Sequence, residues 1–431
     1  MTSARLRMAA GCLLAPLLAA AAVVATAGAA SAGSAGDGGY QGAVFVSPHA
    51  HRHGADRSCG TAAFKKIQQA VDAAAPWGTV VVCPGTYHEQ VVLSRPVTLT
   101  GLRATIDEAG VTPAFQVTLP PPFGTQTIFA AVVIVGSHVR FSGFTVTHAQ
   151  GEGILAAGLG RDISDVSISS SQVVRNDLGF GFPTPRSSYF ECQPAGEIPG
   201  DCGEGVHFTG VADSSIRDSL IAANSGGVLL SDDTGPTHDN LVSGNVVTGN
   251  STDCGITVPG HNPNALSATG RPRPSVAGVY RNVIAGNVVT DNGVAGEGAG
   301  VLFANASAGT ASYDNLVEGN YIAGNGLSGV TMHAHLIGPG QFEDLSGNNV
   351  IGNLIGRNNL DGDTLDSPAS PTDPDPTGVL VYSGGTRVTL TIARNHIFDN
   401  FYGIWLSAAV TASGLGTNSF TNVVIPVSPG H

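Results

Sequence analysis

The stretch DNLVSGNVVTGN occupies Asp239–Asn250, RNVIAGNVVTDN occupies Arg281–Asn292, and DNLVEGNYIAGN occupies Asp314–Asn325. All three carry asparagines and glycines at matching positions, with apolar residues alternating between them. Alternation with a period of two predicts short β-strands, because successive side chains of a strand point to opposite faces. A template that returns with inserts of different length predicts a stack of similar rungs joined by variable loops.

A shorter motif, Asn-x-Val/Ile-x-Gly-Asn, marks the repeat more strictly. Its four copies begin at Asn240, Asn282, Asn315 and Asn348. Each copy is followed five residues later by another asparagine, and weaker copies lie near Ser171, Ser219 and Asn395. Asn and Gly tolerate the left-handed backbone of a sharp corner, and Asn can hydrogen-bond its own turn. Asparagines at equivalent corners are therefore also expected to form a ladder along the stack.

Each copy leads into a glycine and then into alternating apolar residues. The clearest cases begin at Gly227, Gly255, Gly300, Gly329, Gly378 and Gly403. We expect three short strands in each rung, separated by turns. Inward-facing Val, Ile and Leu side chains would fill a continuous core, which no single rung builds alone.

This organisation resembles the right-handed parallel β-helix of the pectate-lyase-like superfamily over roughly residues 44–425. More narrowly, it is similar to secreted bacterial proteins with parallel β-helix repeats, including carbohydrate-binding and sugar-hydrolysing members. The resemblance implies an all-β fold class, a right-handed parallel β-helix with three-strand rungs and an N-terminal capping helix. This fold supports many activities, so the resemblance by itself does not fix a function.

The N-terminal stretch Phe64–Leu93 strengthens the resemblance. Phe64, Ile67, Val71 and Ala74 form one apolar face at helical spacing. In the resembled superfamily such a helix closes the open end of the coil, where unpaired strand edges need a cover. The expected divisions are a signal peptide at 1–32, a lead-in at 33–63, the β-helix with its cap at 64–425, and a tail at 426–431.

The first residues have the features of a secretory signal peptide. Arg5 and Arg7 precede a run of small apolar residues, and Ala30-Ser31-Ala32 supplies an A-x-A cleavage pattern. No later segment reaches eighteen apolar residues, so we expect a soluble, extracellular protein with no membrane contact.

Five cysteines follow the predicted signal peptide, and five cannot all pair. Cys59 with Cys83 is the first predicted disulfide, and Cys192 with Cys202 is the second. Cys254 is then the odd thiol, or it replaces one member of the second pair. Disulfides agree with export, because exported proteins fold in an oxidising compartment.

The charge of the chain excludes one large class of partner. Its formal net charge is −13, and Lys65 and Lys66 are its only lysines. A protein this acidic, without a basic run, has no surface for a nucleic acid backbone. It would hold a polyanionic glycan only with help from a bound cation, and Ca²⁺ is the candidate cofactor. The acidic insert Asp361–Pro376 has suitable carboxylates but lacks the twelve-residue calcium-loop pattern, so a solvated insert is the favoured interpretation.

The rung template brings distant side chains into columns. In each strand that starts at a glycine, positions two, four and six past it are expected to point outward, about 4.8 Å apart between neighbouring rungs. The outward residues that carry chemistry are His207, Thr209, Ser231, Asp233, Thr257, His261, Thr331, His333, His335, Tyr382 and Trp405, with Asp232 and Asn305 beside them and their facing open. In the resembled superfamily, sugar chains lie on the outer face of this sheet.

These residue types suit proton abstraction next to a uronic carboxylate, the shared first step of lyases and epimerases. A histidine, His333 or His335, is the predicted general base, with Asp233 reaching the same face from a lower rung. Tyr382 or His261 would serve as the opposing proton donor, and a cation or an arginine would neutralise the carboxylate. Predicted substrate-binding residues are His207, Asp232, Asn305, Trp405, Tyr189 and Phe190. Two histidines and an aspartate also form a possible metal-ligand set.

A long insert precedes the strand that carries His207. It spans Pro183–Glu204 and holds Tyr189, Phe190 and the two cysteines of the second predicted disulfide. A tied loop with aromatic side chains would form one wall of a sugar-binding groove. The alternative is a loop that is tied only for stability in the exported protein.

Two other functions compete with a lyase or epimerase acting on a uronic-acid-containing polysaccharide. The first is a non-catalytic β-helix, a monomer that binds cell-wall glycan or serves as a surface scaffold; the absence of any complete polygalacturonase or pectin methylesterase signature favours it. The second is a metal-handling β-helix of the copper-delivery type, in which the alternating histidines of HAHRH at His49–His53 would bind the metal. Solvated surface residues are the plain alternative for every histidine in these patterns.

Overall fold

The computed structural model describes residues 42–50, 57–121, 127–177, 204–295, 298–305, 307–334, 338, 340–359 and 376–428. All of them belong to the compact unit Gly38–His431. The predicted signal peptide, Tyr189, Phe190, Cys192, Cys202 and His335 lie outside the described residues.

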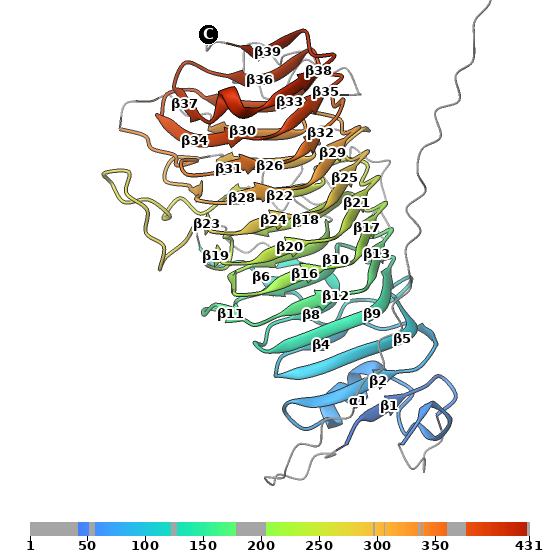
Figure 1. The fold of residues 1–431 in the computed structure, drawn as a ribbon. Helices are drawn as coiled ribbons and strands as arrows, with labels where there is room; N and C mark the ends of the chain where they lie inside the picture. The colour runs from blue at the N-terminus through green and yellow to red at the C-terminus, as the bar shows by residue number, and fades with distance from the viewer. Residues whose placement is uncertain are drawn as a thin grey trace, which may run out of the picture. The chain divides into compact units, whose positions relative to one another are not determined.

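Parallel strands stacked rung upon rung form a right-handed parallel β-helix, as predicted (Figure 1). One sheet, named here the eleven-strand sheet from its described strands, contains the segment that starts at each template glycine. In stacking order it consists of β4 (Val91–Leu93), β8 (Ala130–Ile134), β10 (Glu152–Ala157), β14 (Glu204–Thr209), β18 (Gly226–Ser231), β22 (Ile256–Gly260), β26 (Val301–Asn305), β30 (Val330–Ala334), β33 (Thr377–Ser383), β36 (Tyr402–Leu406) and β39 (Ile425–Ser428).

A second sheet, named here the broad sheet, takes up to two strands from each rung. Its first part is β1 (Val44–Val46), β2 (Gly78–Val82), β3 (Gly85–Tyr87), β5 (Val97–Asp107), β9 (Val139–Thr147), β12 (Ser167–Ser169), β13 (Gln172–Val174), β16 (Ser215–Arg217), β17 (Leu220–Ala222), β20 (Leu241–Ser243) and β21 (Val246–Thr248). It continues with β24 (Val283–Ala285), β25 (Val288–Thr290), β28 (Leu316–Glu318), β29 (Tyr321–Ala323), β31 (Asn349–Ile351), β32 (Leu354–Ile355), β34 (Val388–Ala393), β35 (His396–Phe398), β37 (Val410–Ser413) and β38 (Ser419–Thr421).

Smaller elements complete the described rungs. A third parallel sheet contains β11 (Ile163–Ser164), β15 (Val211–Ala212), β19 (Thr237–His238), β23 (Val279–Tyr280) and β27 (Ser312–Tyr313). β6 (Val117–Thr118) and β7 (Thr127–Ile128) form an antiparallel pair. Two short 3₁₀ turns lie at Cys59–Thr61 and Leu415–Thr417.

The predicted registration of the rungs is confirmed. Val228 pairs with Ile256, Ile256 with Val301, and Val301 with Val330. The same register continues through Val379 and Ile404, and all of these side chains are buried in one apolar core. The template glycines just before them are therefore stacked as well. Glycine is needed there because a Cβ on Gly300, for example, would lie 2.6 Å from the carbonyl oxygen of Gly329 on the next rung.

The repeated asparagines form buried ladders along the stack. The backbone N–H and the side-chain amide of Asn245 both donate to Oδ1 of Asn287, each at 3.0 Å. Asn287 donates in the same way to Asn320 at 2.8 and 2.9 Å. Each corner amide thus satisfies buried backbone groups of two rungs, which explains why this residue type recurs at the corner.

The helix α1 (Ile67–Ala73) covers the N-terminal end of the coil, at the blue end of Figure 1. Ile67, Ala70 and Val71 are buried against the first rungs. The carboxylate of Glu89 accepts hydrogen bonds from the backbone N–H groups of Ile67 and Gln68 at 2.9 and 3.0 Å, and so caps the helix start. Phe64 precedes the helix and forms a bridge with Val46, because the chain is still extended there.

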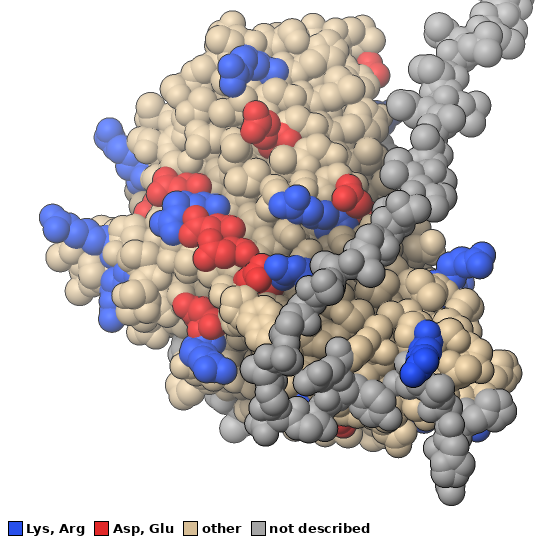
Figure 2. All heavy atoms as spheres, turned by 60° about the horizontal axis from the view of Figure 1, so that its bottom comes forward, with Lys and Arg blue, Asp and Glu red and all other residues tan. Residues whose placement is uncertain are grey.

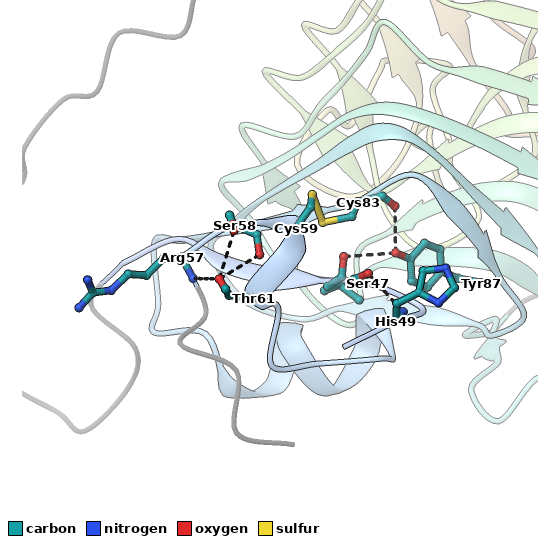
Figure 3. Close-up of a disulfide and its surroundings, with 9 residues drawn as sticks. Ser47, His49, Arg57, Ser58, Cys59, Thr61, Cys83 and Tyr87 are labelled. Atoms are coloured by element: carbon teal, nitrogen blue, oxygen red, sulfur yellow. Dashed lines mark hydrogen bonds between the residues drawn. A yellow bond between two sulfur atoms is a disulfide. The ribbon is translucent and has the colours of Figure 1, made fainter. Parts of the chain in front are cut away.

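The Cys59–Cys83 disulfide is confirmed, with a Cα–Cα distance of 5.6 Å. Figure 3 shows it beside Tyr87, whose hydroxyl donates to the carbonyl of Cys83 at 2.9 Å. Within the described ranges, no helix has the length and apolar character needed to span a membrane.

Candidate functional site

The outer face of the eleven-strand sheet is less polar than its sequence columns suggest. His207 shares its column with Leu229, Thr257, Leu302, Thr331, Leu380 and Trp405. Most of these outward side chains are buried, including Leu229 and Leu380. The polar groups are concentrated instead on the adjacent strands β10, β14, β18 and β22 and in the turns that follow β18 and β22.

A chain of hydrogen bonds runs across three of these strands. Nε2 of His207 lies 2.8 Å from Oγ of Ser231, which in turn donates to Oδ2 of Asp233. Nδ1 of His207 lies 3.2 Å from Oε1 of Glu152, on the other side of the ring. We name the set Glu152, His207, Ser231, Asp233 and His261 the buried polar chain.

His207 is held between two polar side chains. The hydroxyl of Ser231 donates to Asp233, so the N–H of His207 Nε2 is placed to donate to Oγ of Ser231. The side chains of His207 and Glu152 are only 2% exposed, so their contact on the other side of the ring is held away from bulk water.

His261 completes the buried polar chain. Its Nδ1 lies 2.8 Å from Oδ1 of Asp233, and the two side chains are 6% and 2% exposed. Burial favours the neutral acid, but the charge and hydrogen bond of His261 outweigh it and lower the pKa of Asp233. In a neutral His261, this hydrogen bond places the proton on Nδ1 and the lone pair on Nε2, the arrangement of an oriented general base.

Asp232 holds the backbone beside this pair. Its carboxylate accepts from the N–H groups of His261, Asn262 and Gly278 at 2.7, 3.0 and 2.7 Å. Burial, together with the negative charge of Asp233, raises the pKa of Asp232 to about 6. Asp232 was predicted to bind substrate, but its oxygens are used to fix the turn that carries His261.

Asn305 faces the interior and not the outer face. It follows the alternation of Val301 and Phe303, whose side chains fill the core, and it is fully buried. Position five past Gly300 is inward by the same period of two that governs the rest of the strand. Asn305 therefore does not line a sugar-binding surface.

His333 and Tyr382 lie further along the stack. They occupy the same register on the adjacent strands β30 and β33, on the outward side, and both are partly exposed. Three strand spacings separate β30 from β18, about 14 Å at ~4.8 Å per strand. The base predicted at His333 is therefore not the histidine that Asp233 orients. Trp405 is on β36, in register with Leu380, and is 6% exposed.

Glu152 was missed by the sequence prediction, although a local signal for it exists. Gly151-Glu152-Gly153 and Gly203-Glu204-Gly205 repeat the same tripeptide at the starts of adjacent strands. Both glutamates are buried and precede the template glycine. No group of three or more His, Cys, Asp or Glu side chains arranged for a metal ion is present in the described part of the chain.

The fold defines a class, the right-handed parallel β-helix proteins. A family model described as "Periplasmic copper-binding protein (NosD)" matches residues 195–335, about a third of the chain. That segment contains β14, β18, β22, β26 and β30 of the eleven-strand sheet, and every residue of the buried polar chain except Glu152. A search of curated proteins found no match.

Solved structures of low sequence identity are similar to this chain. The pectate lyase Pel9A has a TM-score of 0.51 and 15% identity, over 86% of this chain and 77% of the other. An alginate lyase from Paenibacillus sp. str. FPU-7 has a TM-score of 0.48 and 14% identity, over 83% and 95%. The A-module of the Azotobacter vinelandii mannuronan C-5 epimerase AlgE4 has a TM-score of 0.42 and 15% identity, over 84% and 92%. At 15% identity the likeness to Pel9A supports the fold and leaves the activity open.

Proposed function

We propose that this chain is an exported carbohydrate-active enzyme that removes a proton next to the carboxylate of a uronic acid in a glycan, as a lyase or an epimerase. The observation that carries the proposal is the Asp233–His261 hydrogen bond of 2.8 Å within the buried polar chain. A carboxylate that fixes the proton on Nδ1 leaves Nε2 with the lone pair that a general base needs. The polysaccharide lyases and epimerases among the structural neighbours agree with this class of substrate.

In this mechanism Nε2 of His261 takes the proton from the carbon next to the sugar carboxylate. In a lyase the released electron pair forms a carbon–carbon double bond while the glycosidic carbon–oxygen bond breaks, and the leaving oxygen takes up a proton. In an epimerase a proton returns to the same carbon from the opposite face. Asp233 stabilises the imidazolium that forms, and His207 and Glu152 hold Ser231 so that Asp233 stays oriented.

His333 and Tyr382 would contact neighbouring sugar units. A pyranose ring is about as long as the ~4.8 Å rung spacing, so a glycan lying along the stack passes about one ring per rung. His333 and Tyr382 are partly exposed and adjacent on the outer face, which suits contact with sugar hydroxyls. His335, Tyr189 and Phe190 remain candidates for the same surface. The sugar carboxylate would be neutralised by a cation such as Ca²⁺, or by an arginine.

The proposal is tested with the mature protein and a panel of polygalacturonate, alginate, hyaluronan and neutral xylan, each with and without calcium. Ultraviolet absorbance reports unsaturated lyase products. We expect turnover on a uronic glycan only, and a loss of about 10²-fold in kcat for Asp233→Asn, since the orientation and charge of the base are lost. Turnover with the same kcat in Asp233→Asn would remove Asp233 and His261 from the active site.

A glycan-binding protein without catalysis is the second candidate. It is favoured by the burial of His207 and His261, whose side chains are 2% and 6% exposed, because a base must approach its substrate within hydrogen-bonding distance. Saturable binding of a glycan from the panel, without turnover under any condition, would establish this alternative.

Copper binding is the third candidate, and the NosD family match over residues 195–335 favours it. Histidines in that segment, together with His49 and its neighbours, supply nitrogen ligands of the type that copper prefers. Isothermal titration calorimetry of the mature protein with Cu(I) and with Cu(II) tests this assignment. Stoichiometric binding of either ion would support it.

A periplasmic or extracellular location is part of the proposal. The Cys59–Cys83 disulfide agrees with an oxidising compartment. Fractionation of cells that produce the full chain, with mass spectrometry of the mature N-terminus, tests the predicted cleavage after Ala32.

A further inference from the structure

Trp77 is an exposed aromatic side chain at the N-terminal end of the broad sheet. It is 66% exposed, and it is one of two tryptophans in the chain. Its ring lies 4.9 Å from that of His138, centroid to centroid, so the indole has one aromatic neighbour while most of its surface faces solvent. An indole exposed in this way offers a flat apolar face that the fold does not use.

The register of the stack places this side chain at a corner. Gly78 pairs with Val97, and Val97 with Val139, so Trp77 and His138 stand at the same corner of nearby rungs. Both have left-handed backbone, with φ values of 67° and 60°. Glycine and asparagine adopt this conformation with the least strain, whereas a bulky aromatic residue is uncommon there. Stability of the corner therefore does not explain a tryptophan at this position.

The corner continues into a polar hollow on the broad sheet. The hollow measures about 650 Å³ and lies over β12, β16 and the start of β20. Its floor includes Ser167 and Ser215, which are in register and 3.4 Å apart at their hydroxyl oxygens. Ser169 and Arg217 form the next pair of the same two strands. The floor thus presents hydroxyl and guanidinium groups at the regular spacing of the strands.

Asp165 connects the hollow to the aromatic corner. It lines the hollow, accepts from Nδ1 of His138 at 2.9 Å, and accepts from the Arg140 guanidinium at 2.6 Å. The hydrogen bond from His138, followed by that from Arg140, lowers the pKa of Asp165. The indole of Trp77, the ring of His138 and the polar floor are therefore joined by direct contacts into one surface.

The charges of the hollow select the type of ligand. Four aspartates line it, Asp165, Asp213, Asp218 and Asp239, against the two arginines Arg140 and Arg217. Arg281 also forms an ion pair with Asp239 at 2.6 Å, so the carboxylates are in excess by one charge. Figure 2 shows acidic and basic side chains next to one another on the face in view, with no extended patch of one sign. This excess of carboxylates repels a polyanion, whereas carboxylates and serine hydroxyls together suit ligands with many hydroxyl groups.

We infer that Trp77, His138 and the serine-floored hollow form a binding site for a neutral glycan. One pyranose ring would stack on Trp77, and the following rings would lie in the hollow with their hydroxyls bonded to Ser167, Ser215 and Asp165. The site is on the broad sheet, whereas the proposed catalytic residues are on the eleven-strand sheet. Binding at this site would hold the protein on a neutral polysaccharide, and it does not depend on the proposed catalysis.

The test uses the intrinsic fluorescence of Trp77. The mature protein with Trp405→Phe has Trp77 as its single tryptophan, and it is titrated with cellohexaose, xylohexaose, mannohexaose and, as the charged comparison, hexagalacturonate. We expect a saturable change in fluorescence with at least one neutral hexasaccharide and none with hexagalacturonate. Calorimetry on the wild-type protein checks the same affinities without relying on the Trp405→Phe substitution.

Two variants decide where binding occurs. Trp77→Ala is expected to weaken binding of the neutral hexasaccharide about tenfold or more, because the stacking face is lost. Val424→Ala, equally exposed at 66% and far along the sequence, is the matched control and should bind as the wild type does. No binding of any neutral hexasaccharide, or equal binding by Trp77→Ala and wild type, would overturn the inference. His333→Ala should leave this binding unchanged, whatever its effect on uronic glycans.

Discussion

At the scale of single residues, the molecule keeps several carboxylates away from water. Glu108 is fully buried directly after β5; its Oε2 accepts from the backbone N–H of Gln150 at 3.0 Å, and its Oε1 has no partner in the described part of the chain. Burial raises the pKa of Glu108 to about 7, against the lowering effect of that hydrogen bond. The folded protein therefore binds more protons than the unfolded chain between the ordinary pKa of Glu108 and its raised value.

This gives a pH dependence with a definite sign. The stabilising protonated state of Glu108 is present below its unfolded pKa, and stability falls as pH rises through that value toward about 7. Glu108→Gln removes the ionisation, so we expect the variant to exceed the wild type in unfolding free energy by about 1–3 kcal/mol at pH 8 and to match it near pH 4. Urea denaturation across this pH range measures the difference. A constant offset between the two proteins at every pH would contradict this explanation.

The candidate site contains some residues whose positions could be predicted from the sequence and others whose positions could not. Position five past Gly300 predicts an inward Asn305 by simple alternation, and counting template glycines predicts that β30 is three strands from β18. The Asp233–His261 contact is different, because both residues follow the ends of their strands, where the period of two stops. Their approach depends on turn conformations, including the one that Asp232 fixes through three backbone N–H groups. The contact of Glu152 with His207 likewise becomes visible only once the side chain of His207 has been placed in three dimensions.

At the scale of elements, the asparagine corners join each rung to the next. Asn287 accepts from two nitrogens of Asn245, and its own side-chain amide donates to the carbonyl of Val242 at 2.9 Å and to Asn320. The register of the broad sheet was predictable because each corner repeats this residue type at a fixed place in the template. The inserts between corners vary in length, but they do not change which corners pair, so the register could be predicted in spite of them.

The ladder makes a corner residue far more important than its exposed neighbour. Asn287→Ala leaves the backbone N–H and side-chain amide of Asn245 without their acceptor in a buried place, so we expect a loss of about 2–4 kcal/mol in unfolding free energy. Val288→Ala is the matched control one residue away, where the side chain is 39% exposed, and it should cost less than about 1 kcal/mol. Equal losses in thermal or chemical denaturation would show that the ladder adds little stability.

At the scale of the whole molecule, stability is a sum of contacts between neighbouring rungs, and the ends of the stack are the weak places. The N-terminal end is covered by α1 and tied by the Cys59–Cys83 disulfide, which joins residues 24 apart in sequence. Figure 3 shows the disulfide next to Tyr87, whose single hydroxyl proton is shared between the carbonyl oxygens of Cys83 at 2.9 Å and Val46 at 3.2 Å. The cap, the disulfide and the first strands therefore form one connected unit.

Removal of the disulfide should loosen this end first. We expect the double variant Cys59→Ser, Cys83→Ser to lose about 3 kcal/mol, by the entropy of closing a loop of this length. Hydrogen–deuterium exchange should show lower protection in β1, β2 and α1, with β24 to β30 unchanged. Uniform loss of protection along the whole stack would indicate that the rungs unfold as a single cooperative unit instead.

The claim that Asp233 and His261 abstract a proton from a uronic sugar is tested most directly by exchange with solvent deuterium. The mature protein is incubated with polygalacturonate, alginate and hyaluronan in D₂O, with and without calcium, and the glycans are examined by NMR. The wild type should produce either deuterium at the carbon next to the carboxylate or unsaturated chain ends, and His261→Ala should slow this by about 10²-fold or more, while the surface variant Tyr321→Ala should not. No deuterium and no unsaturation with any glycan, or equal rates in His261→Ala and wild type, would contradict the proposed function.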